Sequence, residues 1–420
     1  MATRRDSREL GTGLAERLFA TRRLTLDLAA PLSDADATIQ PHPDASPAKW
    51  HLAHTTWFFE TFVLRDHARD YRLFDDRFAY LFNSYYEGEG ERHPRPRRGM
   101  LSRPSLDEVR AWRRHVDEAL DRAFPELGEN ALALVELGIH HEQQHQELFL
   151  TDILATLAEN PLEPAYFSRP GEEAGNRRLG LLRSARKNEW VAGHEGIVSI
   201  GATEGDFAFD CERPRHRALL HPHAIASCPV TNAEWDAFTA DGGYTKPTVW
   251  LSEGWDWVQR EQASSPLYWR EDGTHFTLAG RIARDPAAPV SNVSYYEADA
   301  FARWAGARLP REEEWESAAV SADPNEGQQL DRAEAVVPVP KQGWFGGFWE
   351  WTGSAFLPYP GFVTEAGAVG EYNGKFMCSQ FVLKGASCAT PRGHSRVSYR
   401  NFFPPSARWQ FTGVRLARDV

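Results

Sequence analysis

Residues 130–157 read NALALVELGIHHEQQHQELFLTDILATL, and this stretch decides the fold. Its apolar residues recur at helical spacing, so it predicts one helix from Asn130 to Leu157. Side chains four residues apart lie on one face of a helix, a turn apart. The residues that share one such face are Leu134, Gly138, His141, His145 and Leu148. We therefore expect His141 and His145 to point together toward a protein core.

Two histidines in this arrangement predict a metal chelate. A second amphipathic segment carries His54, with Trp50, Trp57 and Phe58 on its inner side. We predict that one metal ion is held by His141 and His145 together with His54, and so by two helices of a bundle. Spacing alone would not select His54, because a third ligand can come from any part of the fold. The alternative is that these imidazoles are hydrogen-bonded core residues without a metal.

Other polar residues lie close to the predicted ligands in sequence. Glu142 and Glu147 either orient the ligand imidazoles or lie on the solvated surface of the helix. His51 and His140 adjoin ligands, but we expect them to point away from the metal.

The bulk properties of the chain limit its function. A length of 420 residues predicts two domains, and a net charge of -12 argues against nucleic acid or an anionic membrane as partner. The sequence has no apolar run of about 18 residues and no apolar signal core near its start. The four cysteines, which form no CxxC pair, favour a reducing cytoplasm. We expect a cytoplasmic protein that acts on small molecules.

Periodicity and capping signals predict four helices in residues 1–160. The first runs from Leu14 to Ala30 and the fourth from Asn130 to Leu157. The second begins after an N-cap at Ser46, with Pro47 at its first position. The third begins at the capping box of Ser105 and Glu108 and has the apolar stripe Val109, Trp112, Val116 and Leu120. A long polar segment, Phe82 to Pro104, separates the second helix from the third. Long ordered loops in compact domains are often functional.

The pattern changes after a linker that we place at 161–189, which is rich in proline, glycine and charge. Residues 190–420 contain most of the tryptophans, many glycines and only short apolar runs. They predict an irregular domain of short strands, with helices over Tyr295–Ala305 and Arg311–Ala319. The expected fold class is therefore α+β.

Ordered motifs in the second half resemble the formylglycine-generating-enzyme-like fold, which is related to C-type lectins. They are Val198-Ser199-Ile200-Gly201, Glu212-Arg213-Pro214, Pro229 to Trp235, Pro289 to Tyr295, Trp304 to Glu316, Phe348 to Thr352 and Gly413 to Arg418. Enzymes that generate formylglycine use a copper bound by cysteines. Nothing marks an equivalent cysteine pair in this chain, so we do not expect that activity.

The first half resembles DinB-like four-helix metal-binding bundles. A DinB-like bundle followed by such a domain is the architecture of the ergothioneine-pathway sulfoxide synthases. Residues 50–58, WHLAHTTWF, are similar to the family's first-ligand helix, and His141-x-x-x-His145-x-Glu147 to its histidine-pair motif. Residues 82–86, FNSYY, and 399–405, YRNFFPP, resemble the branch that uses free cysteine rather than γ-glutamylcysteine.

This resemblance implies an Fe(II) enzyme that uses O₂. It would join the sulfur of cysteine to C2 of hercynine and give a hercynylcysteine sulfoxide. The same centre could instead oxidise the thiol to a sulfinate, so a nearby proton donor should decide the outcome. Tyr85 and Tyr86 are our candidates for this catalytic donor, and the alternative is that they only pack the loop.

Substrate contacts are predicted from charge and from the resemblance. Arg95 and Arg98 lie in the long loop, and either could pair with a substrate carboxylate or remain solvated. By resemblance, Gln144 bonds the hercynine imidazole and Asn401 contacts a substrate carboxylate. Phe402 and Phe403 face the trimethylammonium group or line the cysteine pocket. They replace a Trp-Asp pair of the other branch, which removes an acidic partner for a glutamyl amine.

Other functions remain open from sequence. The string His141-Glu142-x-x-His145 is also the signature of zinc metalloproteases with Glu142 as general base, but the longer motif is broken at Leu148 and Thr151. A lectin-like binding protein with a structural metal would need a closed four-ligand site. Within the family, an ovothiol-type relative is disfavoured because a methyltransferase-like third domain is absent, and a selenium-using relative is not excluded.

Overall fold

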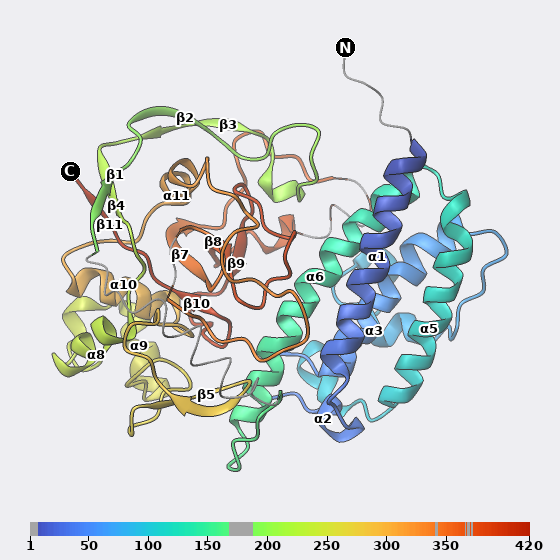
Figure 1. Cartoon of the computed structure of the whole chain (residues 1–420), viewed down its shortest axis with the longest axis horizontal. Helices are drawn as coiled ribbons and strands as arrows, with labels where there is room; N and C mark the ends of the chain where they lie inside the picture. Colours follow the sequence, from blue (N-terminus) through green and yellow to red (C-terminus); the bar gives the residue numbers. More distant parts are fainter. Residues whose placement is uncertain (1–6, 168–187, 341–342, 366, 368–369, 371–372) are drawn as a thin grey trace. The chain divides into compact units, whose positions relative to one another are not determined.

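The computed structural model describes residues 7–167, 188–340, 343–365, 367, 370 and 373–420. Its contacts divide it into two compact units (Figure 1). The first holds the described residues up to Glu159, with Arg332–Glu334 and the described positions within 366–371, and the second holds the others. The predicted linker, 161–189, falls largely on 168–187, outside the described residues, so this three-part division stays a prediction.

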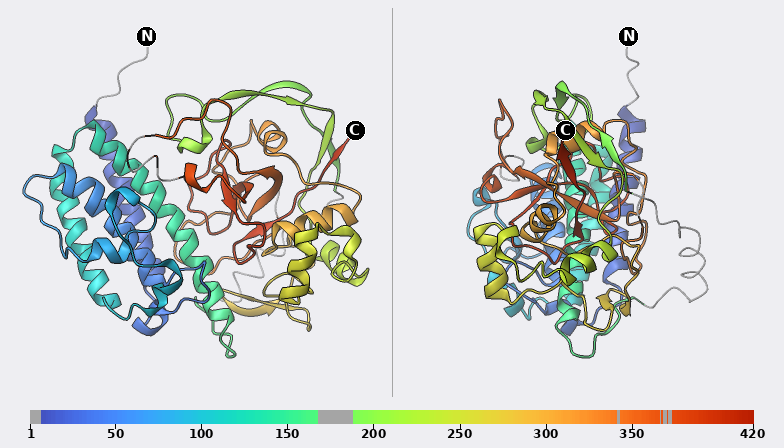
Figure 2. Two further views of the ribbon diagram at one scale, coloured as in Figure 1. Left: turned by 180° about the vertical axis from the view of Figure 1, so that it is seen from behind. Right: turned by 90° about the vertical axis from the view of Figure 1, so that its left-hand side faces the viewer.

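The first unit is a bundle of four long helices. They are α1 (Ser7–Ala29), α3 (Ala48–Phe59), α5 (Leu106–Ala123) and α6 (Glu129–Ala158). Shorter elements are α2 (Asp34–Thr38), α4 (Phe78–Phe82), the π-helical turn η1 (Glu60–Arg65) and the 3-10 turns η2 (Glu87–Glu89), η3 (Arg95–Met100) and η4 (Phe124–Glu126). Helix α6 packs along both α1 and α3, and the left view of Figure 2 shows the bundle from behind. The four predicted helices are confirmed.

The first residues of two helices show where the local sequence was sufficient to predict the N-cap. At α5 the predicted capping box is present, with Ser105 and Glu108 each bonded to the other's backbone N–H. The predicted cap at Ser46 is wrong, because α3 begins one residue later and Pro47 occupies the N-cap position without a side-chain bond. Two contacts explain the difference: Ser46 N–H donates to Asp152, and the Ser46 hydroxyl accepts from Arg98.

Packing in the bundle brings α3 and α6 unusually close at Gly138. A Cβ atom at this position would lie 2.5 Å from Cε1 of Phe59 and 3.0 Å from Cε1 of Phe58. Only glycine leaves room for both rings one turn before His141. The predicted stripe on α5, from Val109 to Leu120, is fully buried on the facing side.

The second unit combines small sheets with short helices. A four-stranded sheet has the order β10 (Thr412–Gly413), β7 (Phe348–Ala355), β8 (Phe381–Ala386), β9 (Asn401–Phe403), and a three-stranded sheet the order β1 (Trp190–Ala192), β4 (His223–Ala226), β11 (Ala417–Asp419). Two hairpins pair β2 (Gly196–Ile200) with β3 (His216–Leu220) and β5 (Thr274–Thr277) with β6 (Gly280–Ala283). All pairs are antiparallel except β10 with β7.

The helices of this unit are α8 (Asn232–Ala240), α9 (Ser252–Glu261), α10 (Tyr295–Trp304) and α11 (Glu312–Ala318), with 3-10 turns η5 (Asp210–Glu212), η6 (Pro247–Val249) and η8 (Gly374–Phe376). The predicted helices at 295–305 and 311–319 are confirmed. Buried tryptophans fill the core, and Trp315 donates its indole N–H to Glu350, which also pairs with Arg415. The predicted α+β fold class is confirmed. None of the helices in the described ranges has the length and apolarity needed to cross a membrane.

Candidate metal centre

Three histidines converge inside the bundle. His54 comes from α3, and His141 and His145 come from successive turns of α6. One possible ligand atom from each ring lies within 4.8 Å of the other two, which is the spacing that a shared metal ion requires. His54 Nε2 is buried and has no hydrogen-bond partner in the part of the chain that the structure describes. The spacing of the three side chains therefore fits a shared metal ion.

The orientation of His54 is fixed on several sides. Its Nδ1–H donates to the carbonyl oxygen of Phe82 at 2.6 Å, which leaves the lone pair on Nε2. The ring lies between Trp50, with centroids 4.5 Å apart, and Trp57, at 5.5 Å, and both indoles are nearly parallel to it. The imidazole is therefore held before any metal binds.

Burial keeps the three rings neutral. Desolvation lowers the pKa of His141 to about 3 and the pKa values of His54 and His145 well below the ordinary 6.5. The neighbouring imidazoles lower the pKa values of His54 and His145 further. A metal binds the neutral form, so all three side chains are ready to act as ligands at neutral pH.

The structure corrects the prediction for His51. It lies outside the ligand group, as expected, but it does not point away from it. Its Nδ1 is 2.9 Å from Nδ1 of His145, and its Nε2 is 3.1 Å from Oδ2 of Asp152. Sequence spacing missed this contact because it joins α3 to α6. His140 is buried elsewhere on α6, with its Nε2 3.5 Å from Arg17.

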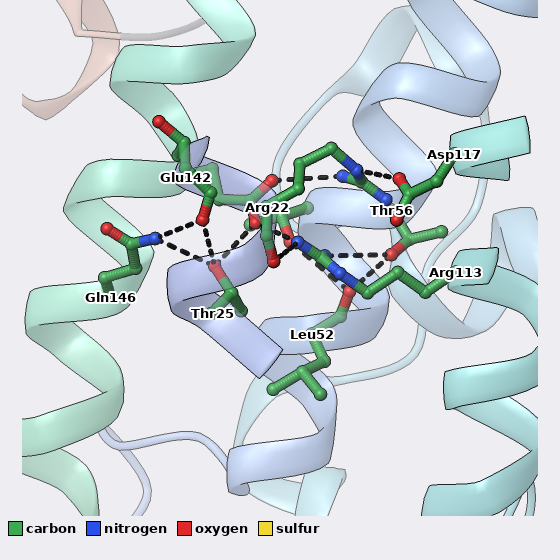
Figure 3. Close-up of polar contacts among 10 residues, drawn as sticks. Arg22, Thr25, Leu52, Thr56, Arg113, Asp117, Glu142 and Gln146 are labelled. Atoms are coloured by element: carbon green, nitrogen blue, oxygen red, sulfur yellow. Dashed lines mark hydrogen bonds and ion pairs between the residues drawn. The ribbon is translucent and has the colours of Figure 1, made fainter. Parts of the chain in front are cut away.

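Both predicted alternatives for Glu142 are wrong. Its side chain is 0% exposed and joins a polar network on a face of α6 next to that of the histidines (Figure 3). It accepts hydrogen bonds from Arg22 at 3.0 Å, from Thr25 at 2.6 Å and from Arg113. Although burial raises the pKa of Glu142, the charges of Arg113 and Arg22 lower it below its ordinary value. A carboxylate whose oxygens are bonded in this way is not placed to take a proton from a metal-bound water, which argues against a metalloprotease. Glu147, by contrast, is half-buried.

The network continues around these groups. Arg22 also bonds Asp117, Arg113 bonds Thr55 and Thr56 at 3.2 and 3.3 Å, and Gln146 donates to Thr25 at 2.9 Å. These residues come from α1, α3, α5 and α6. The network therefore ties the four long helices together beside the metal centre.

Arg98 and Arg95 are placed differently. Arg98 is 3% exposed, stacks over Trp50 with its guanidinium carbon 3.4 Å from the ring centroid, and donates to the hydroxyls of Ser46 and Ser84. It pairs with no carboxylate among the described residues. Burial, and then the charge of Arg95, holds the pKa of Arg98 well below its ordinary value. Arg95 is exposed and donates to the carbonyl oxygen of Asp44.

The two candidate tyrosines occupy different environments. Tyr86 is buried, and its ring packs 5.4 Å from Trp57 and 5.2 Å from Phe62. Tyr85 is half-buried and stacks on Tyr86 with centroids 4.7 Å apart. Trp57 thus connects the pair to His54. Gln144 is half-buried on α6, one residue before His145.

The remaining candidates belong to the second unit, on the edge strand β9. Phe402 stacks on Phe356 at 4.1 Å and on Phe376 at 5.9 Å. Asn401 and Phe403 flank it on the strand, so their side chains leave the opposite face of the sheet. The Asn401 side-chain oxygen accepts a hydrogen bond from the backbone N–H of Phe402 at 2.9 Å.

Comparisons with known proteins cover both units. The model for the DinB superfamily matches residues 17–149, and the model for the sulfatase-modifying factor enzyme 1-like domain matches residues 183–337 and 342–420. The hercynine oxygenase of Mycolicibacterium smegmatis is 32% identical over 97% of this chain and 99% of its own length. That of Mycobacterium tuberculosis is 34% identical over the same shares. Ergothioneine biosynthesis protein 1 of Schizosaccharomyces pombe is 26% identical over 51% of this chain and 28% of its own length.

Proposed function

Because this chain belongs to the hercynine oxygenase family, we propose that it is a metal-dependent sulfoxide synthase of ergothioneine biosynthesis. Its reaction joins the sulfur of L-cysteine to C2 of the hercynine imidazole and places one oxygen atom on the sulfur. The thiol hydrogen and the C2 hydrogen leave as water with the second atom of O₂. The observation that carries this proposal is the buried cluster of His54, His141 and His145, whose spacing fits one metal ion.

Fe(II) is the ion that we assign to this cluster. Three neutral imidazoles leave coordination positions open for small molecules, unlike a closed structural site. When bound there, Fe(II) would supply the reduction of O₂ and hold the cysteine thiolate near the hercynine ring. The protein's part is to present three nitrogen atoms in fixed orientations, which the Phe82 carbonyl and the stacked indoles do for His54.

Arg98 is our candidate for binding a substrate carboxylate. A buried guanidinium without a carboxylate partner is costly, and an anionic substrate would relieve that cost. The Ser46 and Ser84 hydroxyls and the face of Trp50 already hold Arg98 in place. Its charge also contributes to the lowered pKa values of His54 and His145, which indicates that it lies near the metal centre. Arg95 remains a second, exposed candidate.

The other substrate contacts follow the family resemblance. Gln144 adjoins His145 and bonds the hercynine imidazole, while Asn401 bonds a substrate carboxylate. Phe402 and Phe403 offer aromatic faces and no charge to a substrate. Because an acidic partner for a glutamyl amine is lacking at these two positions, free cysteine is the proposed sulfur donor.

Tyr85 and Tyr86 are the proposed proton donors. A phenolic O–H that donates during O₂ reduction favours sulfoxide formation, and its loss favours oxidation of cysteine to the sulfinate. The half-buried Tyr85 and the core-packed Tyr86 can be separated by single Tyr→Phe variants. We expect the donor's variant to shift the ratio of sulfoxide to sulfinate, while the other variant keeps the wild-type ratio.

We propose that the reaction takes place in the cytoplasm. No disulfide joins the four cysteines, all of which lie in the described ranges, and Cys211 and Cys388 are buried. Unpaired cysteines are typical of a reducing compartment.

The decisive experiment is anaerobic reconstitution with Fe(II), followed by O₂ uptake with hercynine and a thiol. Products are identified by mass spectrometry. We expect hercynylcysteine sulfoxide from cysteine and little coupled product from γ-glutamylcysteine. His54→Leu should abolish both metal binding and turnover. The matched control is His115→Leu, because His115 packs against Tyr71 and Phe74 in the same bundle. Absence of O₂ uptake with any thiol would overturn the proposal.

A further inference from the structure

A buried chain of hydrogen bonds leads away from His145. Oδ2 of Asp152 accepts the backbone N–H of Ser46 at 2.8 Å and lies 3.1 Å from Nε2 of His51. Nδ1 of His51 then lies 2.9 Å from Nδ1 of His145. Asp152 and His51 are both at least nine-tenths buried, so water does not replace these contacts. Helix α6 supplies both ends of the chain, and α3 supplies His51 between them.

The chemistry of the groups fixes where the hydrogens lie. An ionised carboxylate only accepts hydrogen bonds, so Nε2 of His51 carries a hydrogen and donates it to Asp152. In a neutral imidazole the other nitrogen is then an acceptor, so Nδ1 of His51 has a lone pair. Its contact with His145 therefore requires a hydrogen on Nδ1 of His145. That tautomer leaves Nε2 of His145 as the nitrogen with a lone pair.

We propose that Asp152 and His51 are positioning residues that hold His145 with its hydrogen on Nδ1 and its Nε2 available as a metal ligand. This inference rests on the metal site proposed above and assigns it an outer layer. His54 reaches the same state by another route, because its Nδ1–H donates to the Phe82 carbonyl. Two ligands from different helices are thus both set to bind through Nε2. Partners of this kind orient a ligand and raise its basicity.

The first test measures metal affinity with Co(II) as the probe, by titration of the metal-free protein and by the visible spectrum of the bound ion. His51→Leu removes the acceptor, and loss of such a partner typically weakens binding about 10–100-fold. His51→Gln restores a side-chain oxygen that can accept from His145 and an amide N–H that can donate to Asp152. We expect His51→Gln to recover most of the affinity, and Asp152→Asn to cause a smaller loss than His51→Leu.

His115→Leu is the matched control and should bind Co(II) like the wild type. Thermal unfolding of each metal-free variant identifies any that fail to fold. If folded His51→Leu binds Co(II) as tightly as the wild type, with the same spectrum, the positioning role is wrong. If the wild type itself binds no Co(II), the proposed metal site fails instead, so the two failures are distinguishable.

A second test needs no variant. Nitrogen NMR of protein labelled at its histidines and loaded with Zn(II) reports which ring nitrogen carries hydrogen and which binds metal. We expect His145 to show a hydrogen on Nδ1, protected from exchange, and a metal-bound Nε2. Coordination through Nδ1 of His145 would overturn the proposal even if all variants misfold.

Discussion

Two of the arginines that the bundle buries, Arg113 and Arg98, have opposite surroundings. Arg113 is surrounded by acceptors, namely Glu142, two threonine hydroxyls and the Arg22 carbonyl. Arg98 has two serine hydroxyls and an indole face, but it pairs with no carboxylate among the described residues. Proteins normally satisfy buried charges, so the first site is what stability alone would produce. The Arg98 site, by contrast, is what we expect where a buried arginine is kept for an anionic ligand.

The same contrast separates two neighbouring faces of α6. Glu142 and Gln146 face the polar network of Figure 3, in which both carboxylate oxygens of Glu142 accept hydrogen bonds from other helices. His141 and His145 directly precede these two residues in the sequence and lie next to His54 instead. Nε2 of His54 has no hydrogen-bond partner among the described residues. Stability and function thus occupy adjacent positions on one helix. The following predictions test whether this division is real.

The largest effect is expected at the polar network around Glu142. Glu142→Gln removes the charge that two buried arginines share, so it should lower the free energy of unfolding by about 3–5 kcal/mol. Chemical denaturation measures this difference. The control is Glu136→Gln on the same helix, where the pair with Arg17 is exposed and the loss should stay below about 1 kcal/mol. Equal effects of the two changes would show that the buried network contributes no special stability.

The second prediction uses pH to separate the two regions in the metal-free protein. A histidine whose pKa is lowered in the folded state takes up a proton on unfolding at low pH. Its contribution to the free energy of unfolding is therefore full above pH 6.5 and is lost as the pH falls. For His141 this loss extends from the unfolded value of 6.5 to the folded value of about 3. Within this pH range the free energy of unfolding should fall by about 1.4 kcal/mol per pH unit for each such histidine.

Glu142 behaves differently because its lowered pKa belongs to an acid. Its contribution is full above the ordinary value of 4.5 and is lost only below it. Between pH 7 and 5, in the presence of a chelator, the pH dependence of the free energy of unfolding should therefore reflect the histidines and not Glu142. His141→Leu should reduce the slope in that range. An unchanged slope would contradict neutral buried ligands.

The sequence predicted the parts of the molecule that local rules determine. Capping chemistry located the start of α5, helix period located both ends of α6 to within a residue, and the four-residue spacing paired His141 with His145. It could not predict the roles of Glu142 and His51. Their partners lie on other helices, with Arg22 120 residues from Glu142 and Asp152 101 residues from His51. The two candidate arginines of the loop looked equivalent for the same reason, since only tertiary packing buries Arg98.

The third prediction concerns the distance between the ligand helices. Gly138→Ala places a Cβ atom 2.5 Å from the Phe59 ring, so α3 and α6 must separate or the ring must move. Overpacking of this kind costs about 1–3 kcal/mol. Because His54 and His141 lie on these helices, Co(II) affinity should fall as well. Gly128→Ala, where the new atom meets nothing within 4 Å, should leave Co(II) affinity at the wild-type value.

The smallest change in stability and the clearest change in function are expected at Arg98. Arg98→Met removes a buried charge that no carboxylate balances, so the lost hydrogen bonds and the relieved desolvation should nearly cancel, within about 1 kcal/mol. The KM for cysteine should nevertheless rise at least about tenfold, equivalent to about 1.4 kcal/mol of binding. Arg95→Met should change this KM little, because Arg95 is exposed.

Arg113→Met completes the comparison, since it leaves the buried Glu142 with Arg22 as its one cationic partner among the described residues. It should destabilise the protein by several kcal/mol, in the range of about 3–5 kcal/mol, without raising the KM for cysteine in the folded fraction. Steady-state kinetics and denaturation on the same preparations measure both quantities. If Arg98→Met instead destabilises the bundle as strongly as Arg113→Met and leaves the KM unchanged, Arg98 is a structural residue. The unpaired arginine would then no longer mark the substrate site.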